Sequence, residues 1–208
     1  SLLLVFTKYL NKILEIGKDF VRVQPGVYFR DLETELQKRN LFYPAYPASK
    51  DICAIGGMIA NNSGGEKTLA YGKTERYVWE LKAVLGDGEE HVIKPLKQKD
   101  LEVKIQEKTF EGGVYKKIYE LIRKNRALIE ASRPKVSKNS AGYVLWNIIQ
   151  NNTFDLTQLF VGSQGTLGII TEAKLGVLPI PKYTRLVAVF LKDISRLGNI
   201  IVEALKHK

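Results

Sequence analysis

A glycine-rich stretch constrains the fold of this chain more than any other feature: residues 51–65 read Asp-Ile-Cys-Ala-Ile-Gly-Gly-Met-Ile-Ala-Asn-Asn-Ser-Gly-Gly. Adjacent glycines lower helix stability by roughly 1 kcal/mol each relative to alanine, so Gly56 and Gly57 argue against a core helix. They fit a sharp bend, or a place where another molecule approaches the backbone with no Cβ in the way. The Asn-Asn-Ser at 61–63 can line a phosphate-bearing or heteroaromatic ligand. A glycine-rich turn between two core elements is the alternative, and this stretch alone slightly favours the turn.

A second glycine-rich stretch favours the ligand-binding interpretation over the turn. Residues 159–173 read Leu-Phe-Val-Gly-Ser-Gln-Gly-Thr-Leu-Gly-Ile-Ile-Thr-Glu-Ala, and shorter motifs precede it: Pro-Gly-Val at 25–27, Pro-Ala-Ser at 47–49, Tyr-Gly-Lys-Thr at 71–74 and Lys-Asn-Ser-Ala-Gly-Tyr at 138–143. In order and spacing these motifs resemble the PCMH-type FAD-binding domain of the FAD-linked oxidases. That family includes glycolate oxidase FAD subunits, D-lactate dehydrogenases and D-2-hydroxyglutarate dehydrogenases. The resemblance runs from about Leu14 to the end of the chain.

The resemblance implies an α+β fold of the PCMH type, with mixed sheets flanked by helices. In the family, a glycine-rich loop that wraps the FAD pyrophosphate precedes the place where this chain begins, so we expect a domain lacking its first segment. We expect this FAD-binding domain, truncated at its N-terminus, to cover residues 1–182. Residues 183–208 are expected to begin a C-terminal cap, or substrate, domain.

The resemblance also implies which residues contact the cofactor. An isoalloxazine ring needs a flat slot lined by backbone donors, and dipoles or cations stabilise the negative charge that develops on it. Most family members have Glu where Gln164 stands, a difference that matters little if the contact is through the backbone. The predicted FAD-binding residues are Ser49, Ala54, Gly56, Gly57, Asn61, Asn62, Ser63, Gly64, Gln164, Gly165, Thr166, Leu167, Gly168, Ile169 and Ile170.

Lys138, Asn139 and Tyr143 resemble the family's motif beside the flavin face. A lysine there can stabilise a reduced-flavin anion or a substrate carboxylate, whereas Tyr143 fits a core tyrosine with a satisfied hydroxyl equally well. The family's general base is a histidine and metal cluster in the cap domain. No histidine-rich motif occurs here, so catalytic residues stay unassigned and we expect this polypeptide alone to be inactive.

The implied function is the FAD-binding portion of an oxidoreductase that oxidises a 2-hydroxy acid, of the D-lactate or glycolate type, by hydride transfer to FAD. Its expected partners are that substrate and an electron acceptor. An alternative is a non-catalytic flavin-binding module that needs a partner subunit. A third hypothesis, a basic nucleic-acid-binding domain, rests on the net charge of +10, but the basic residues are not interleaved with aromatic ones.

Other patterns exclude several kinds of site. Gly72-Lys73-Thr74 imitates the end of a P-loop, but Lys67 stands where that motif needs glycine. His91 and His207 have no second ligand nearby in sequence, so no metal site is predicted.

The single cysteine, Cys53, suits a reducing compartment. With no apolar run of the ~20 residues that a membrane span needs, we expect a cytoplasmic protein, with peripheral association with the inner membrane as the alternative.

Periodicity predicts the secondary structure between the motifs. Strands are expected at 2–6, 20–24, 169–178 and 185–191, and a hairpin at 79–93. Helices are expected at 28–40, at 114–129 with Ile118, Leu121, Ile122, Asn125, Leu128 and Ile129 on one face, at 155–160 and at 194–205. Residues 41–49 are expected to be extended, 94–111 to form a charged irregular surface loop, and 132–143 to form a loop.

Overall fold

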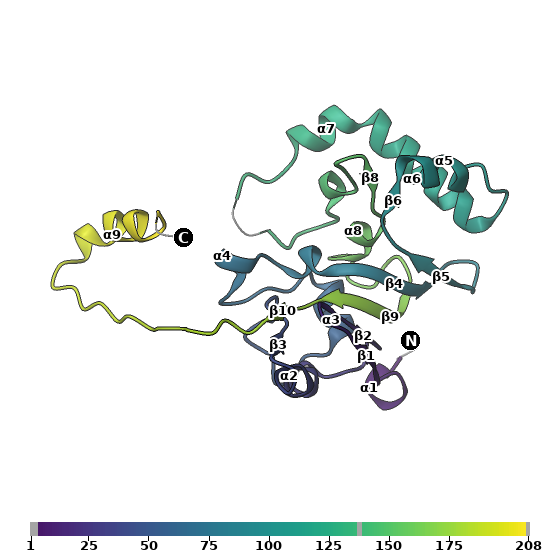
Figure 1. Cartoon of the computed structure of the whole chain (residues 1–208). Coiled ribbons are helices and arrows are strands. Elements are labelled where there is room, and N and C mark those ends of the chain that lie inside the picture. Colours follow the sequence, from purple (N-terminus) through teal and green to yellow (C-terminus); the bar gives the residue numbers. More distant parts are fainter. Residues whose placement is uncertain (1–3, 137–138, 207–208) are drawn as a thin grey trace.

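The computed structural model describes residues 4–136 and 139–206 (Figure 1). In chain order the elements are α1 (Phe6–Tyr9), β1 (Ile13–Ile16), β2 (Phe20–Val23), α2 (Phe29–Gln37), β3 (Leu41–Phe42), α3 (Ile55–Ala60), α4 (Thr68–Tyr71), η1 (Thr74–Arg76), β4 (Val78–Val84), β5 (Glu90–Ile93), β6 (Leu96–Lys97), α5 (Gln98–Lys104), α6 (Phe110–Lys124), α7 (Arg126–Ala131), η2 (Leu145–Asn147), β7 (Ile149–Gln150), β8 (Thr153–Phe154), α8 (Thr157–Phe160), β9 (Ile169–Gly176), β10 (Leu178–Pro179), η3 (Ile194–Arg196) and α9 (Leu197–Ala204).

A five-stranded sheet in the order β1-β2-β9-β4-β5 is the centre of the fold, and two small sheets, β10-β3 and β6-β8-β7, accompany it. The pairings between these strands are antiparallel. Helices α5, α6 and α7 lie on one side of the large sheet in Figure 1, and α2 lies on the other. The predicted α+β class is confirmed, with antiparallel rather than mixed sheets.

The two faces of the large sheet differ because successive side chains of a strand point to opposite faces. Val21, Leu81 and Ala173 are buried on one face. On the opposite face Arg22 of β2 pairs with Glu80 of β4 at 2.9 Å and with Glu172 of β9 at 2.6 Å. These charged residues join three neighbouring strands across the face that the core does not cover.

The predicted helix at 28–40 is confirmed as α2. Phe29, Leu32 and Leu36 are all within 1% of complete burial, which is the burial that their helical spacing predicts. The predicted hairpin is confirmed as β4 and β5. The predicted strands at 20–24 and 169–178 correspond to β2 and β9, and the short helix at 155–160 corresponds to α8.

The prediction of an irregular loop at 94–111 is wrong. The segment contains β6, α5 and the start of α6. Leu101 of α5 is only 1% exposed, and Ile105, just after the helix, packs against the core. These two apolar side chains, four residues apart, anchor a helix that otherwise carries charged residues, Gln98 and the exposed Val103. Helix α6 begins at Phe110, before the predicted start, because the side chain of Thr109 accepts a hydrogen bond from the N–H of Gly112.

The prediction of one continuous helix at 114–129 also needs correction. Asn125 leaves the helical conformation and separates α6 from α7. Leu121 and Leu128, placed on the predicted apolar face, are 48% and 66% exposed. Ile122 is buried, and Ile118 and Ile129 pack against the core, as predicted. The buried side of α6 also carries Tyr115.

The predictions of strands at 2–6 and 185–191 are both wrong for the described residues of those segments. Within 2–6, residues 2 and 3 lie outside the described residues, and Leu4 and Val5 are half exposed before α1 begins at Phe6. Residues 185–191 are extended but carry no strand pairing. They belong to an arm that leaves the sheet after β10 and ends in α9 (Figure 1). Alternating apolar residues form a strand only beside another strand, and none of the described strands lies next to this arm.

Glu172 makes a pH-dependent contribution to stability. Its side chain is 13% exposed and accepts hydrogen bonds from Arg22 at 2.6 Å and Lys82 at 3.1 Å. Burial raises the pKa of Glu172, but these hydrogen bonds outweigh burial and hold the pKa below its ordinary value of 4.5. Because the folded-state pKa is the lower one, the contribution is present above that ordinary value and is lost as the pH falls through the folded-state pKa.

We therefore expect the free energy of unfolding of Glu172→Gln, measured by urea titration, to decrease less between about pH 5 and about pH 2.5 than that of the wild type. Glu120→Gln, an exposed position on α6, is the control and should follow the wild type. Identical pH dependence in Glu172→Gln and the wild type would contradict the assignment.

Candidate functional site

The two glycine-rich stretches meet at one groove of about 600 Å³. Residues of α1 and of the segment just before it form a third wall. The predicted site residues that line the groove are Ala54, Gly56, Gly57, Gln164, Gly165, Gly168, Ile169 and Ile170. The lining residues that the sequence analysis missed are Leu4, Val5, Phe6, Thr7, Pro25 and Ala60.

Backbone hydrogen bonds hold the two stretches together. Gly162 N–H donates to the carbonyl of Ile59 at 3.0 Å, and Gln164 N–H donates to the carbonyl of Ala60 at 2.9 Å. The side-chain amide of Gln164 also donates to Asn61 Oδ1 at 3.2 Å. Because two of these bonds involve backbone atoms only, the two stretches are joined here without interlocking side chains.

The adjacent glycines lie inside a helix, α3, so the expectation that they exclude one is wrong. The N–H groups of the first helical residues donate to preceding backbone carbonyls: Ile55 to Val27 and Gly56 to Pro25. A Cβ on Gly56 would lie 2.7 Å from Pro25 Cβ, whereas a Cβ on Gly57 would meet nothing within 4 Å. Gly56 therefore permits close packing, and Gly57 leaves backbone bare toward the groove.

The turn at the other wall has an uncommon backbone conformation. Gly162, Gln164 and Gly165 have φ values of 86°, 56° and 75°. A non-glycine residue with positive φ is uncommon and costs roughly 1–2 kcal/mol. The hydrogen bonds of Gln164 to Ala60 and Asn61 hold it in that conformation, so a strained residue lies on the wall of the groove.

Several predicted residues do not line this groove. Asn62 is fully buried, and its side chain both donates to the carboxylate of Glu75 and accepts from Glu75 N–H. Ser63 is buried, and its carbonyl accepts the Thr74 hydroxyl. Gly64 packs against Thr68 and Lys73. Leu167 packs against the core, while Ser49 begins a turn in which its carbonyl accepts the N–H groups of Ile52 and Cys53.

The segment after Asn139 is fixed to the site by polar contacts. Lys138 lies outside the described residues. Lys73 Nζ donates to the carbonyl of Asn139 and lies 3.5 Å from the carboxylate of Glu75. Tyr143 is 40% exposed, and its hydroxyl pairs with that of Thr166 at 2.7 Å. Tyr143 is thus not a core tyrosine, and Thr166, a predicted site residue, contacts it beside the groove.

The groove carries no charged side chain among its described lining residues. A separate, polar cavity of about 480 Å³ surrounds Arg76, Trp146 and Asp155 and includes none of the predicted site residues. In the part of the chain that the structure describes, no cluster of three or more His, Cys, Asp or Glu is placed to hold a metal ion. The apolar groove walls and bare backbone suit an uncharged planar ring.

Comparisons with known proteins agree on one family. Residues 1–94 match the family model described as an FAD binding domain. D-2-hydroxyglutarate dehydrogenase of Pantoea ananatis is 35% identical over 87% of this chain and 18% of its own length. The glycolate oxidase subunit GlcD of Bacillus subtilis is 32% identical over 100% of this chain and 34% of its own. D-lactate dehydrogenase of Anaerostipes hadrus is 33% identical over 83% and 26%.

The chain thus spans about a third or less of the length of these relatives. Among solved structures, alkyldihydroxyacetonephosphate synthase shares the fold, with a TM-score of 0.50 and 20% identity over 84% of this chain and 24% of that one. No helix within residues 4–136 and 139–206 is long and apolar enough to cross a membrane.

The backbone analysis predicts opposite effects for two glycine substitutions on the groove wall. Gly165→Ala adds a methyl group in open space but at a positive φ, so we expect a loss of roughly 1–2 kcal/mol of unfolding free energy. Gly57→Ala also adds a methyl group in open space, but in a helix, so we expect a gain of up to about 1 kcal/mol. Denaturant titration of the two variants measures both, and a shift in the same direction for both would contradict this account.

Proposed function

We propose that this chain, which belongs to the FAD-linked oxidases through its FAD-binding domain, holds FAD in the groove between its two glycine-rich stretches. The observation that carries the proposal is Gly57, whose missing side chain leaves backbone open to a groove of about 600 Å³. Gly165, Gly168 and the Gln164 backbone form the facing wall. A flat ring can approach such a slot closely because few side chains project into it.

We propose that the activity served by this site is oxidation of a 2-hydroxy acid of the D-lactate or glycolate type. FAD, when bound, supplies the acceptor for the hydride that leaves the substrate carbon. The chain's own residues orient the ring and exclude water from the apolar wall formed by Ile169, Ile170 and Phe6. The names of the relatives, a glycolate oxidase subunit and two kinds of 2-hydroxy-acid dehydrogenase, support this substrate class.

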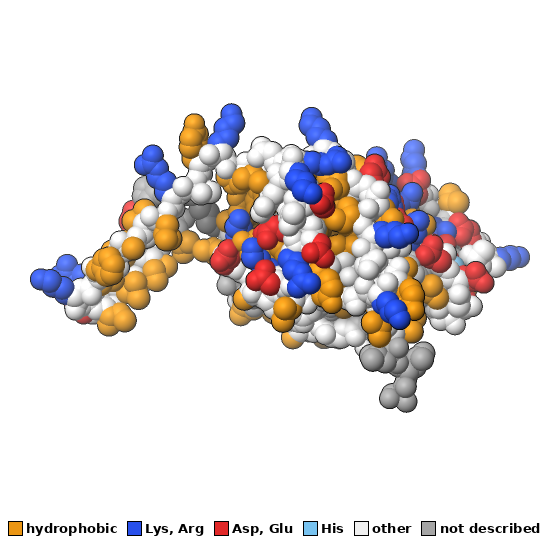
Figure 2. All heavy atoms as spheres, turned by 90° about the horizontal axis from the view of Figure 1, so that it is seen from below, with side chains coloured by type: hydrophobic (Ala, Val, Ile, Leu, Met, Phe, Trp, Pro, Cys, Tyr) orange, Lys and Arg blue, Asp and Glu red, His pale blue; other side chains and the backbone are white. Residues whose placement is uncertain are grey.

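We also propose that residues 1–182 form the FAD-binding domain and that residues 183–208 begin a second, cap or substrate, domain. The described part of the second segment has little contact with the first. Leu186, Val187 and Phe190 are 97%, 79% and 94% exposed. Figure 2 shows apolar side chains along the arm that carries them. Exposed apolar surface of this kind marks a site for interaction, which supports a covering domain.

The same exposed arm supports a second candidate function, a flavin-binding module that pairs with a partner subunit. In that case the partner covers the arm and contributes to the active site. GlcD of Bacillus subtilis is named as a subunit of glycolate oxidase, which agrees with this possibility. Cys53 stands alone in the sequence, which fits a reducing compartment and supports a cytoplasmic location, with peripheral membrane association as the alternative.

FAD binding to the purified chain tests the proposed site. We expect FAD to bind with quenching of its fluorescence, and Gly57→Ala to weaken binding about tenfold, or about 1.4 kcal/mol, because its methyl group occupies the slot. Gly113→Ala is a matched control: Gly113 is also a helical glycine with open space around it, but it lies on α6 away from the groove. Equal affinity of Gly57→Ala and Gly113→Ala for FAD would refute the site.

A further inference from the structure

A second, smaller cavity of about 140 Å³ lies between the β4–β5 hairpin, α6 and α8. Its walls are built largely from apolar side chains of separate elements, among them Ile93, Val114, Ile118, Leu159, Phe160 and Leu167. Ile93 is 2% exposed and Phe160 is 6% exposed, so the walls belong to the core. Leu159, Phe160 and Leu167 belong to the second glycine-rich stretch, but the sequence analysis did not predict this cavity.

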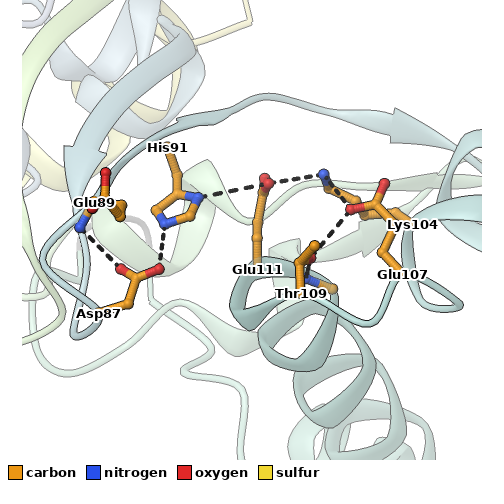
Figure 3. Close-up of polar contacts among 8 residues, drawn as sticks. Asp87, Glu89, His91, Lys104, Glu107, Thr109 and Glu111 are labelled. Carbon is orange, nitrogen blue, oxygen red and sulfur yellow. Dashed lines mark hydrogen bonds and ion pairs between the residues drawn. The ribbon is translucent and has the colours of Figure 1, made fainter.

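The charged residue at the polar edge of the cavity is already engaged by neighbouring groups. Glu111, the charged residue among its described lining residues, accepts a hydrogen bond from Lys104 at 2.8 Å and lies 3.6 Å from His91 Nδ1. His91 Nε2 in turn pairs with Asp87 at 2.9 Å (Figure 3). The carboxylate of Glu111 is therefore engaged by these neighbours, and the Tyr115 hydroxyl is the other side-chain polar group in the lining.

Such a space does not favour water. A buried water needs two to four polar partners, whereas an apolar cavity of about 150 Å³ lined by Leu, Ile and Phe stays dry and binds benzene or xenon. This cavity resembles that case in volume and in its mostly apolar lining, and differs from it in having Glu111 and Tyr115 at one edge. Phe110, which is 47% exposed, and the exposed Gly86 form the part of the lining nearest to solvent, so a small molecule has a short route inward.

The cavity also adjoins the groove. Leu167 lines the cavity, and the next residue, Gly168, lines the groove. A methyl group on Gly168 would lie 3.1 Å from Leu85 Cδ2 and 3.3 Å from Phe160 Cε1. Leu85 and Phe160 both line the cavity, so a single layer of residues separates the two spaces.

We propose that this cavity is a binding site for a small, uncharged, apolar molecule no larger than benzene, a class that includes dioxygen. Of the charged groups in Figure 3, Glu111 lines the polar edge of the cavity, where Lys104 and His91 already engage its carboxylate. The cavity is independent of FAD, because its walls come from β5, α6 and α8 with Leu85 and Leu167 as the boundary to the groove.

Benzene and xenon are the probes. We expect benzene to raise the Tm of the wild type in a saturable way, and xenon to shift the methyl NMR signals of Leu159 and Leu167. Val114→Phe fills the cavity and should lower benzene affinity at least about tenfold. Val103→Phe is the matched control, because Val103 is 68% exposed on α5 and does not line the cavity; it should retain the wild-type response.

Val114→Leu adds less volume and provides a second variant if Val114→Phe does not fold; it should weaken benzene binding by a smaller factor. Absence of any saturable Tm rise and of xenon-induced methyl shifts in the wild type would overturn the proposal, as would equal benzene affinity in Val114→Leu or Val114→Phe and the wild type. FAD titration of the same samples reports separately on the groove, so failure of FAD to bind would leave the cavity result standing.

Discussion

The groove depends on backbone hydrogen bonds between two segments that are far apart in the sequence. Gln164 and Asn61, which also contact each other through their side chains, are separated by 103 residues. The carbonyls of Ile59 and Ala60, at the end of α3, accept the N–H groups of Gly162 and Gln164. Bonds of this kind need no side chain, so glycines can occupy both surfaces at the groove. The turn then continues directly into β9, which is paired on both sides at the centre of the sheet, and this fixes one wall of the groove.

The sequence predicted two of the three walls of the groove, because the order and spacing of the glycine-rich motifs resemble an FAD-binding domain. The first glycine-rich stretch alone slightly favoured a turn. The sequence did not reveal which of the predicted polar residues line the groove and which are buried elsewhere. Asn62 and Gly57 belong to the same motif, yet Asn62 turns inward to Glu75 while Gly57 opens to the groove. An amide side chain serves a buried carboxylate as readily as a ligand, and only the tertiary contact distinguishes the two. Pro25 belongs to the Pro-Gly-Val motif at 25–27, but nothing in the neighbouring sequence indicated that it would pack on Gly56.

The spacing of apolar residues predicted the secondary structure correctly where an element buries only one face, as α2 does. The low helix propensity of glycine gave a wrong prediction at Gly56 and Gly57. Hydrogen bonds to preceding carbonyls, and packing on Pro25, stabilise a short helix that the residues alone disfavour. In α5 the anchoring residue Leu101 stands among charged ones, so the apolar signal was too sparse to recognise. Residues 185–191 alternate as a strand does, but alternation cannot supply the neighbouring strand that pairing requires.

The place of β9 in the sheet has a consequence for how the chain reaches its native state. β9 joins β2 to β4, yet it is made some 150 residues after β2, as the Arg22–Glu172 pair illustrates. Until it emerges from the ribosome, β1-β2 and β4-β5 are two separate hairpins, each with one edge lacking its partner. Long-range pairing of this kind slows folding and exposes strand edges to other chains. During synthesis these hairpin edges are therefore most vulnerable to aggregation just before β9 appears.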